Sequence, residues 1–89
     1  MEIRYHAQFN RDLRRLRNPS LAQSIKEIIS ELKAASSLTD VRGVRRLRGQ
    51  GRHYRIRIGE YRLGITQDGD TTIILRRLLH RSEIYRNFP

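Results

Sequence analysis

The stretch HYRIRIGEYRLGI, residues 53–65, contains two runs in which apolar and basic side chains alternate. A period of two is typical of a β-strand with one buried and one exposed face. Gly59-Glu60 separates the runs, and a Gly-X pair in this position predicts a two-residue hairpin turn. The turn fixes the register of facing residues: Ile58 with Tyr61, Ile56 with Leu63, and Arg57 with Arg62.

Arg57 and Arg62 are therefore expected to face each other as two cations on adjacent strands. Like charges opposed in this way destabilise a strand pair, so we expect the pair to meet an anion. Alternation places Arg55 and Gly64 on the same face, opposite the buried one. We expect an open basic surface there, with Gly64 leaving room for a phosphate backbone.

The composition also indicates a polyanionic partner. The 89 residues include 19 Lys and Arg, of which 17 are Arg, against 9 Asp and Glu, and the net charge is +10. Residues 41–89 contain twelve of the bases and four of the acids, so the excess lies in the second half. Arginine grips phosphate with a planar fork of donors, which makes nucleic acid the expected partner class.

Other classes are excluded by length and composition. A chain of this size is expected to form one domain, residues 1–89. It has no cysteine, and its three scattered histidines lack metal-ligand spacing, so we expect no metal and no cofactor. The charged start MEIRYH is unlike a signal peptide and no apolar run has membrane-spanning length. We therefore expect a cytoplasmic location and no membrane partner.

The remaining pattern predicts an α+β domain. Residues 2–6 read as a strand, and Phe9, Leu13 and Leu16 recur with helical spacing after it. Asn18-Pro19 predicts the start of a second helix, because asparagine caps helices and proline fits their first position. This second helix is expected to bury five aliphatic side chains, Leu21, Ile25, Ile28, Ile29 and Leu32.

β patterning recurs at residues 44–48, 53–58, 61–67 and 72–79, and SEIYRNF predicts a short C-terminal helix or turn. We expect the helical hairpin to pack on one face of a mostly antiparallel sheet. The sheet is expected to have four strands, with a three-stranded antiparallel meander beside the N-terminal strand. Tyr54 and Tyr61 fall on its buried face, where packing is their expected role.

Two groups near the C-terminus can move a proton, His80 and Tyr85. Cleavage of RNA by its own 2′-hydroxyl needs a base for that hydroxyl, cations for the charge on the phosphorane, and an acid for the leaving 5′-oxygen. Arginine stays protonated, so tyrosine or histidine must act as acid or base. These residue types together are consistent with a metal-free ribonuclease.

The runs RRLRGQGRHYRIRIGEYRLGI and ILRRLLHRSEIYR, and the chain as a whole, resemble the RelE toxins of bacterial type II toxin-antitoxin systems, within the RelE/ParE superfamily. The resemblance implies an endonuclease that cleaves mRNA in the ribosomal A site and arrests translation. It also implies a co-expressed antitoxin, with an acidic or apolar segment, that silences the toxin in a hetero-oligomer.

The resemblance further implies roles for individual residues. The family's phosphate-binding cations correspond to Arg55, Arg57, Arg62 and Arg81, and Tyr85 corresponds to the residue that orients or deprotonates the 2′-hydroxyl. The spacing between Arg81 and Tyr85 is shorter than in the family, which leaves His80 as an alternative to Arg81. Three basic residues before the hairpin are expected to bind RNA as well: Arg46, Arg48 and Arg52.

Two other functions share this fold or this surface. A toxin of the ParE class has the same fold but poisons DNA gyrase, and a non-enzymatic module would bind RNA or the ribosome without chemistry. Retention of Arg57, Arg62 and Tyr85 favours the nuclease. A gyrase poison would block replication before protein synthesis, and an inactive binder would survive loss of Tyr85.

Overall fold

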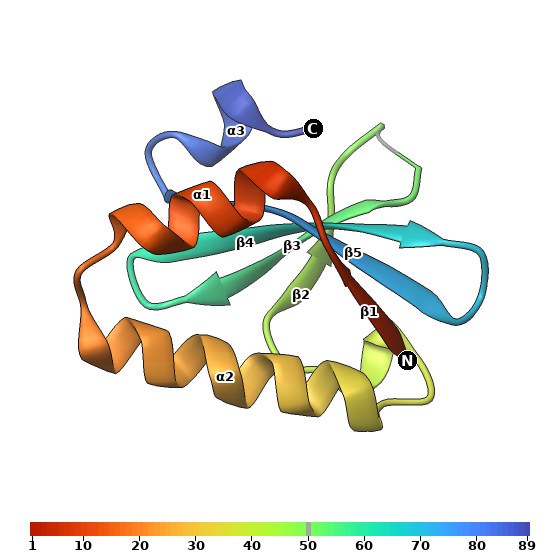
Figure 1. Ribbon diagram of the computed structural model, residues 1–89. Helices are drawn as coiled ribbons and strands as arrows, with labels where there is room; N and C mark the ends of the chain where they lie inside the picture. Colours follow the sequence, from red (N-terminus) through yellow and green to blue (C-terminus); the bar gives the residue numbers. More distant parts are fainter. Residues whose placement is uncertain (50) are drawn as a thin grey trace.

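The computed structural model describes residues 1–49 and 51–89 and contains one sheet with two helices packed against it (Figure 1). The predicted α+β class and the order of the elements are confirmed. The elements are β1 (Glu2–Tyr5), α1 (Ala7–Arg15), α2 (Pro19–Ala34), the 3₁₀ turn η1 (Leu38–Asp40), β2 (Val44–Arg46), β3 (His53–Ile58), β4 (Tyr61–Asp68), β5 (Thr72–His80) and α3 (Ile84–Asn87).

The sheet has five strands in the order β1-β5-β4-β3-β2, so the expected count of four is wrong by one. β1 pairs in parallel with β5, and the other neighbours are antiparallel. The fifth strand is β2, which lies within the β-patterned residues 44–48 and pairs with the outer edge of β3. Gly43, with a φ of 80°, turns the chain into this strand, which is too short for alternation to reveal its pairing.

The β3–β4 hairpin has the predicted register. Ile58 faces Tyr61, Ile56 faces Leu63 and Arg57 faces Arg62. Gly59 has a φ of 59°, and among the described residues positive φ occurs only at glycines. This combination at Gly59-Glu60 fits a type II′ turn, which matches the twist of the two strands.

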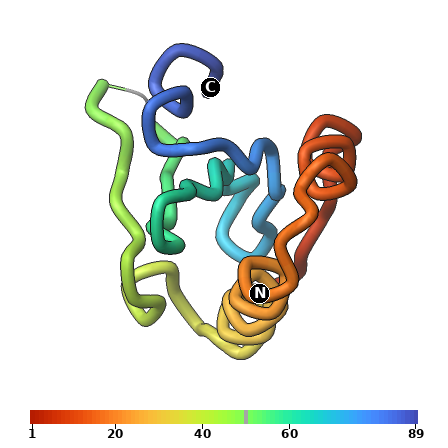
Figure 2. Tube along the Cα trace, turned by 90° about the vertical axis from the view of Figure 1, so that its left-hand side faces the viewer, coloured from red at the N-terminus to blue at the C-terminus, as the bar shows by residue number. Residues whose placement is uncertain are grey.

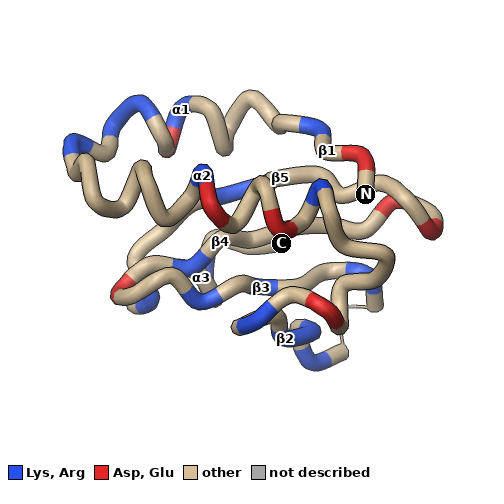
Figure 3. Tube along the Cα trace, turned by 90° about the horizontal axis from the view of Figure 1, so that it is seen from below, with Lys and Arg blue, Asp and Glu red and all other residues tan. Residues whose placement is uncertain are grey.

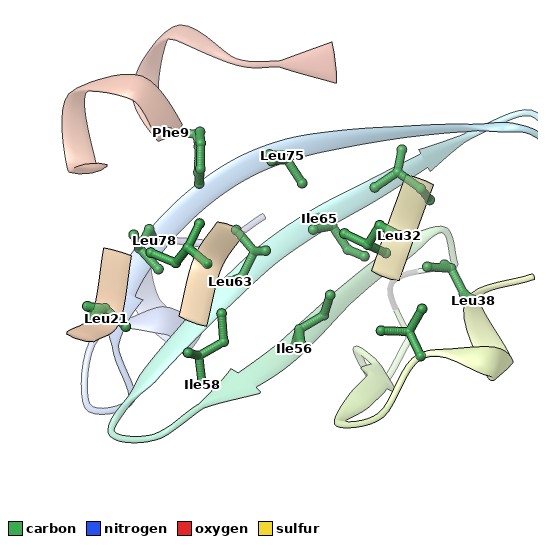
Figure 4. Packing of buried hydrophobic residues seen from close by; sticks show 13 residues of the cluster. Phe9, Leu21, Leu32, Leu38, Ile56, Ile58, Leu63, Ile65, Leu75 and Leu78 are labelled. Carbon is green, nitrogen blue, oxygen red and sulfur yellow. The ribbon is translucent and has the colours of Figure 1, made fainter. Parts of the chain in front are cut away.

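The predicted start of α2 is confirmed, since the Asn18 side chain accepts the N–H of Leu21 and Pro19 occupies the first turn. α1 and α2 cover one face of the sheet, where Phe9 and Leu32 are fully buried over the aliphatic residues of β3, β4 and β5 (Figure 4). Of the five α2 side chains expected to be buried, Ile28 and Ile29 are only half-buried at the margin of the core. A groove remains between the two helices, and Leu13, Leu16 and Ile29 line it.

A buried ion pair fastens α1 to β5. The carboxylate of Asp12 accepts from Arg77 Nε at 2.8 Å, from Arg77 Nη2 at 3.2 Å and from the backbone N–H of Leu78 at 2.9 Å. This hydrogen bonding raises the pKa of Arg77. The pair lies beside a β-bulge, where Gly64 of β4 pairs with Arg77 and the next residue pairs with Leu75.

The C-terminal segment covers part of the other face of the sheet (Figure 2). Ile84 and Phe88 are buried there with Leu47, and Leu79 packs against them. A Cβ on Gly64 would come within 2.7 Å of Phe88 Cδ2. The expectation that Gly64 leaves room for a phosphate backbone is therefore wrong, because the ring of Phe88 occupies that space. The face is also less open than predicted.

Candidate functional site

The face of the sheet that α1 and α2 leave uncovered has a cluster of arginines. The hairpin register places Arg57 directly across from Arg62, and alternation along β3 adds Arg55. Burial lowers the pKa of Arg62, and the nearby charges of Arg55, Arg57 and Arg81 lower it further. In Figure 3, blue basic segments gather around β2, β3 and α3. The term arginine cluster is used below for Arg55, Arg57, Arg62 and Arg81.

Arg62 is held against the hairpin turn. Its Nη1 donates to the carbonyl oxygens of Gly59 and Tyr61, both at 2.9 Å. Its Nε is buried without a partner in the described part of the chain. Arg57 is exposed on the neighbouring strand. The cluster therefore combines one fixed guanidinium with one that can move to meet a ligand.

Tyr85 is positioned over the cluster by its neighbours in α3. Ile84 and Phe88 are almost fully buried, whereas Tyr85 is 63% exposed. The Cζ atom of Arg55 lies 5.1 Å from the centre of the Tyr85 ring, within the range of a cation–π contact. The phenol is thus held beside the arginines while remaining accessible from solvent.

Arg81 joins the cluster from the end of β5. Its Nε lies 2.7 Å from Glu60 Oε2, and its backbone N–H donates to the Glu60 carbonyl at 2.8 Å. Both side chains are largely exposed, so the ion pair contributes little to stability. It connects the end of β5 to the β3–β4 turn, next to Arg62.

His80 lies on the opposite face of the sheet, and the structure does not bring it together with the arginine cluster. It pairs with Tyr61, and the two rings meet edge to face with centres 5.6 Å apart. The backbone N–H of Ser82 donates to His80 Nδ1 at 3.2 Å. A neutral His80 therefore has its proton on Nε2. The ring lines a cavity of about 270 Å³ beside Asp12 and Arg15.

The three further arginines expected to bind RNA are dispersed. Arg46 faces Tyr54, on the side of the sheet opposite the cluster. Arg52 lines a groove together with Arg46, and Arg48 is exposed in the turn between β2 and β3. Adjacent residues of a strand point to opposite faces, so Arg45 takes the place on the cluster side.

Two arginines on the cluster side were not among the predicted site residues. Arg45 is exposed directly across from Arg55, and Arg76 donates from Nη1 to Thr66 Oγ1 at 3.3 Å. Alternation in VRR could have indicated Arg45, but only with the β2–β3 register known. The β-bulge in β5 conceals the direction of Arg76, because it interrupts the alternation.

His53 is the first residue of β3 and lies on the cluster side of the sheet, across from Thr66 of β4. Its Nδ1 is 2.9 Å from Thr66 Oγ1, and its ring meets the Phe88 ring edge to face. Burial lowers the pKa of His53, and the charges of Arg52 and Arg76 lower it further. The imidazole is therefore more readily neutral in the folded protein than in an unfolded chain.

Residues 1–49 and 51–89 contain neither a cluster of metal ligands nor a membrane-spanning helix. No group of three or more His, Asp or Glu side chains in these ranges could hold a metal ion. No helix within them is long and apolar enough to cross a membrane.

Comparison with known proteins identifies the family. The family model for the ParE toxin of the type II toxin-antitoxin system parDE matches residues 3–85. Toxin RelE3 of Methanocaldococcus jannaschii is 40% identical over the whole of both chains. The chain belongs to the RelE family of toxins. Putative toxin RelE1 of the same organism is 31% identical, and the match covers 96% of this RelE-family chain and 94% of the relative.

Solved structures of relatives agree with this assignment. A crystal structure of the RelB-RelE antitoxin-toxin complex from Methanococcus jannaschii contains a chain that is 38% identical. That match covers 97% of this RelE-family chain and 99% of the other, with a TM-score of 0.81. The toxin-antitoxin complex RelBE2 from Mycobacterium tuberculosis contains a chain that is 27% identical. It covers 90% of this chain and 96% of its own, with a TM-score of 0.70. This RelE-family chain is thus a toxin of a type II toxin-antitoxin system.

Proposed function

We propose that this toxin is an endoribonuclease that cleaves mRNA in the ribosomal A site, without a metal ion, and so inhibits translation. The observation that supports the proposal best is the grouping of four arginines with one accessible tyrosine on a single face. This grouping supplies positive charge and a proton-bearing group on the same surface. A cytoplasmic location follows from the proposed substrate.

In the proposed reaction the 2′-hydroxyl attacks the adjacent phosphorus. The bond from the 2′-oxygen to phosphorus forms, and the bond from phosphorus to the 5′-oxygen breaks. Tyr85 Oη orients the 2′-hydroxyl or takes its proton, and the departing 5′-oxygen takes a proton from a solvent water molecule. Arg55, Arg57 and Arg81 bind the phosphate, and Arg62, held by its two carbonyl acceptors, faces the charge that builds on the phosphorane. The products are a 2′,3′-cyclic phosphate and a 5′-hydroxyl.

Tyr85 is a better candidate than His80 for the proton transfer. Tyr85 lies beside Arg55, whereas His80 packs against Tyr61 on the other side of the sheet. The Nδ1 atom of His80 already accepts the backbone N–H of Ser82, so it is less available than Tyr85 Oη to act on a 2′-hydroxyl. His80 remains the alternative that the experiment below tests.

We propose that a cognate antitoxin silences the toxin in a hetero-oligomer. The support comes from the two similar solved chains, which are parts of antitoxin-toxin complexes. Because the net charge is +10, we expect an acidic segment of the antitoxin to cover the arginine cluster.

The deciding experiment compares Tyr85→Phe with His80→Gln on ribosomes that display a defined mRNA. We expect Tyr85→Phe to slow cleavage by about 100-fold or more, the scale of a lost general base, while binding is retained. His80→Gln should have a mild effect, and the RNA ends should be a 2′,3′-cyclic phosphate or 3′-phosphate and a 5′-hydroxyl. Cleavage by the Tyr85→Phe variant at the wild-type rate, or a product with a 5′-phosphate, would refute the mechanism.

A gyrase poison is the second candidate, because the matching family model is that of the ParE toxin. The two functions differ in the process that stops first when the toxin is expressed alone. Pulse labelling should show protein synthesis failing before DNA synthesis. The reverse order would assign the chain to the gyrase poisons. Full toxicity of Tyr85→Phe would instead indicate a non-enzymatic module that binds RNA or the ribosome.

A further inference from the structure

Arg46 lies outside the arginine cluster, in a groove that the proposed cleavage does not use. β2 places it across from Tyr54, on the face that α1 and α2 cover. Its Nη2 donates to Tyr54 Oη at 3.2 Å, and its Cζ is 5.6 Å from the centre of the ring. Arg46 is exposed, and it has no carboxylate partner among the residues the structure describes. A guanidinium is thus held in one orientation without being neutralised.

The groove consists of two adjoining hollows that share Arg46, Tyr54 and Gln67 as walls. One has a volume of about 490 Å³ and extends to Leu38 of the 3₁₀ turn. The other has a volume of about 440 Å³ and extends to Arg52 and Asp70. The walls therefore include two arginines and one acid, together with an aromatic ring and an amide.

The surrounding segment is the most basic part of the chain. Residues 41–59 include seven arginines and no acid. Arg45 and Arg46 are consecutive and point to opposite faces of the sheet, toward Arg55 and Tyr54 respectively. The β2–β3 hairpin therefore presents arginine on both of its faces, which suits an element lying between two polyanionic segments.

We propose that the Arg46–Tyr54 groove is a second RNA-binding site, which holds a segment of folded RNA while the arginine cluster holds the strand to be cleaved. The inference rests on the proposed function, in which the folded RNA belongs to the ribosome. Arg46, oriented by Tyr54, binds a phosphate through its planar fork, and the amide of Gln67 suits a ribose 2′-hydroxyl. One strand would have to reverse around the edge strand β2 to occupy both faces, so the two sites suit separate segments.

The experiment uses two neighbouring residues as a matched pair. Arg46→Thr and Arg45→Thr remove the same charge from the same short strand, but on opposite faces. Arg4→Thr, on β1 at the far edge of the sheet, controls for net charge. Affinity is measured for small ribosomal subunits over a range of salt concentrations and for a short single-stranded RNA. The Tyr85→Phe background keeps the RNA intact.

We expect Arg46→Thr to weaken binding to the subunits by about tenfold, the scale of one charge-assisted contact, and to reduce the salt dependence by about one counterion. Its affinity for the short RNA should match that of Arg4→Thr, whereas Arg45→Thr should bind the short RNA more weakly. Two results would overturn the proposal. Arg46→Thr could bind the subunits as tightly as Arg4→Thr, or it could lose affinity for the short RNA as Arg45→Thr does.

Failure of the proposed function would look different. In that case the wild-type protein would cleave no mRNA on ribosomes. The comparison of Arg46→Thr with Arg4→Thr in binding would still decide whether the groove contacts folded RNA, because it requires no cleavage.

Discussion

Threonine substitutions at Arg57 and Arg62 separate the contribution of the arginine pair to function from its contribution to stability. Both changes remove one of two cations that face each other across β3 and β4. Removing such a repulsion gains roughly 0.2–1 kcal/mol, and threonine is a good strand residue. We expect both variants to lose cleavage, because each removes a phosphate-binding charge.

The two variants should differ in stability. Arg57 is exposed, so Arg57→Thr should leave the free energy of unfolding unchanged or raise it by up to about 1 kcal/mol. Arg62 donates to the carbonyls of Gly59 and Tyr61, and each such bond is worth about 1 kcal/mol. After the relieved repulsion is subtracted, Arg62→Thr should lower the free energy of unfolding by about 1–2 kcal/mol. For a domain of this size that is a fall in Tm of about 5–10 °C.

Thermal unfolding of the purified toxin measures the stability, and cleavage of ribosome-bound mRNA measures the function. Arg57→Lys is the matched control, since it keeps the charge and loses only the planar fork. It should retain more activity than Arg57→Thr and have the Tm of the wild type, because the like-charge pair remains. If Arg57→Thr unfolded many degrees below the wild type, Arg57 would be a structural residue, and the like-charge pair would need another explanation. If either threonine variant cleaved mRNA at the wild-type rate, the two arginines would not belong to the proposed site.

Three other predictions concern the parts of the fold that support the site. Gly64→Ala should displace Phe88, at a cost of about 1–3 kcal/mol, and increase hydrogen exchange in α3; unchanged exchange would contradict the close packing. Asp12→Ala should cost about 3 kcal/mol because Arg77 and the Leu78 N–H lose their acceptor. Glu2→Ala, which removes the exposed ion pair with Arg4, should cost less than about 1 kcal/mol. Equal losses of stability in Asp12→Ala and Glu2→Ala would disprove this distinction between a buried and an exposed ion pair. Because the pKa of His53 is lowered by folding, the unfolded chain binds its proton more readily, so stability should fall as the pH drops from about 7 to about 5. His53→Gln should weaken that dependence, and an identical pH profile would exclude His53 as its source.

The hairpin could be predicted from the sequence because its determinants are local. Alternation assigns the faces of β3 and β4, and Gly59-Glu60 fixes their register, so the opposition of Arg57 and Arg62 follows from thirteen consecutive residues. The start of α2 is local in the same way, since Asn18 and Pro19 act on the adjacent turn. Features of this kind need no knowledge of distant parts of the chain.

The features that the sequence concealed depend on contacts between distant residues. β2 has only three residues, and its register with β3 depends on the turn that joins them, so the sequence did not show that Arg45 and Arg46 lie on opposite faces of the sheet. The space above Gly64 looks empty from β4 alone, and only the packing of Phe88 fills it. Similarly, the half-burial of Leu13 and Ile29 depends on the separation of two helices, which periodicity does not specify.

The packing of Phe88 against Gly64 shows how the site is assembled. A glycine that seemed to leave space for RNA instead leaves space for Phe88, and Phe88 with Ile84 fixes the short helix α3 on the sheet. That helix has only four residues, so it gains little stability of its own and depends on these two anchors. Tyr85 lies between the anchors and reaches Arg55 only while they are docked. The β3–β4 hairpin therefore positions Arg55, Arg57 and Arg62, and the end of β5 positions Arg81. The proposed proton-transfer group, Tyr85, is instead positioned by the absence of a side chain at residue 64.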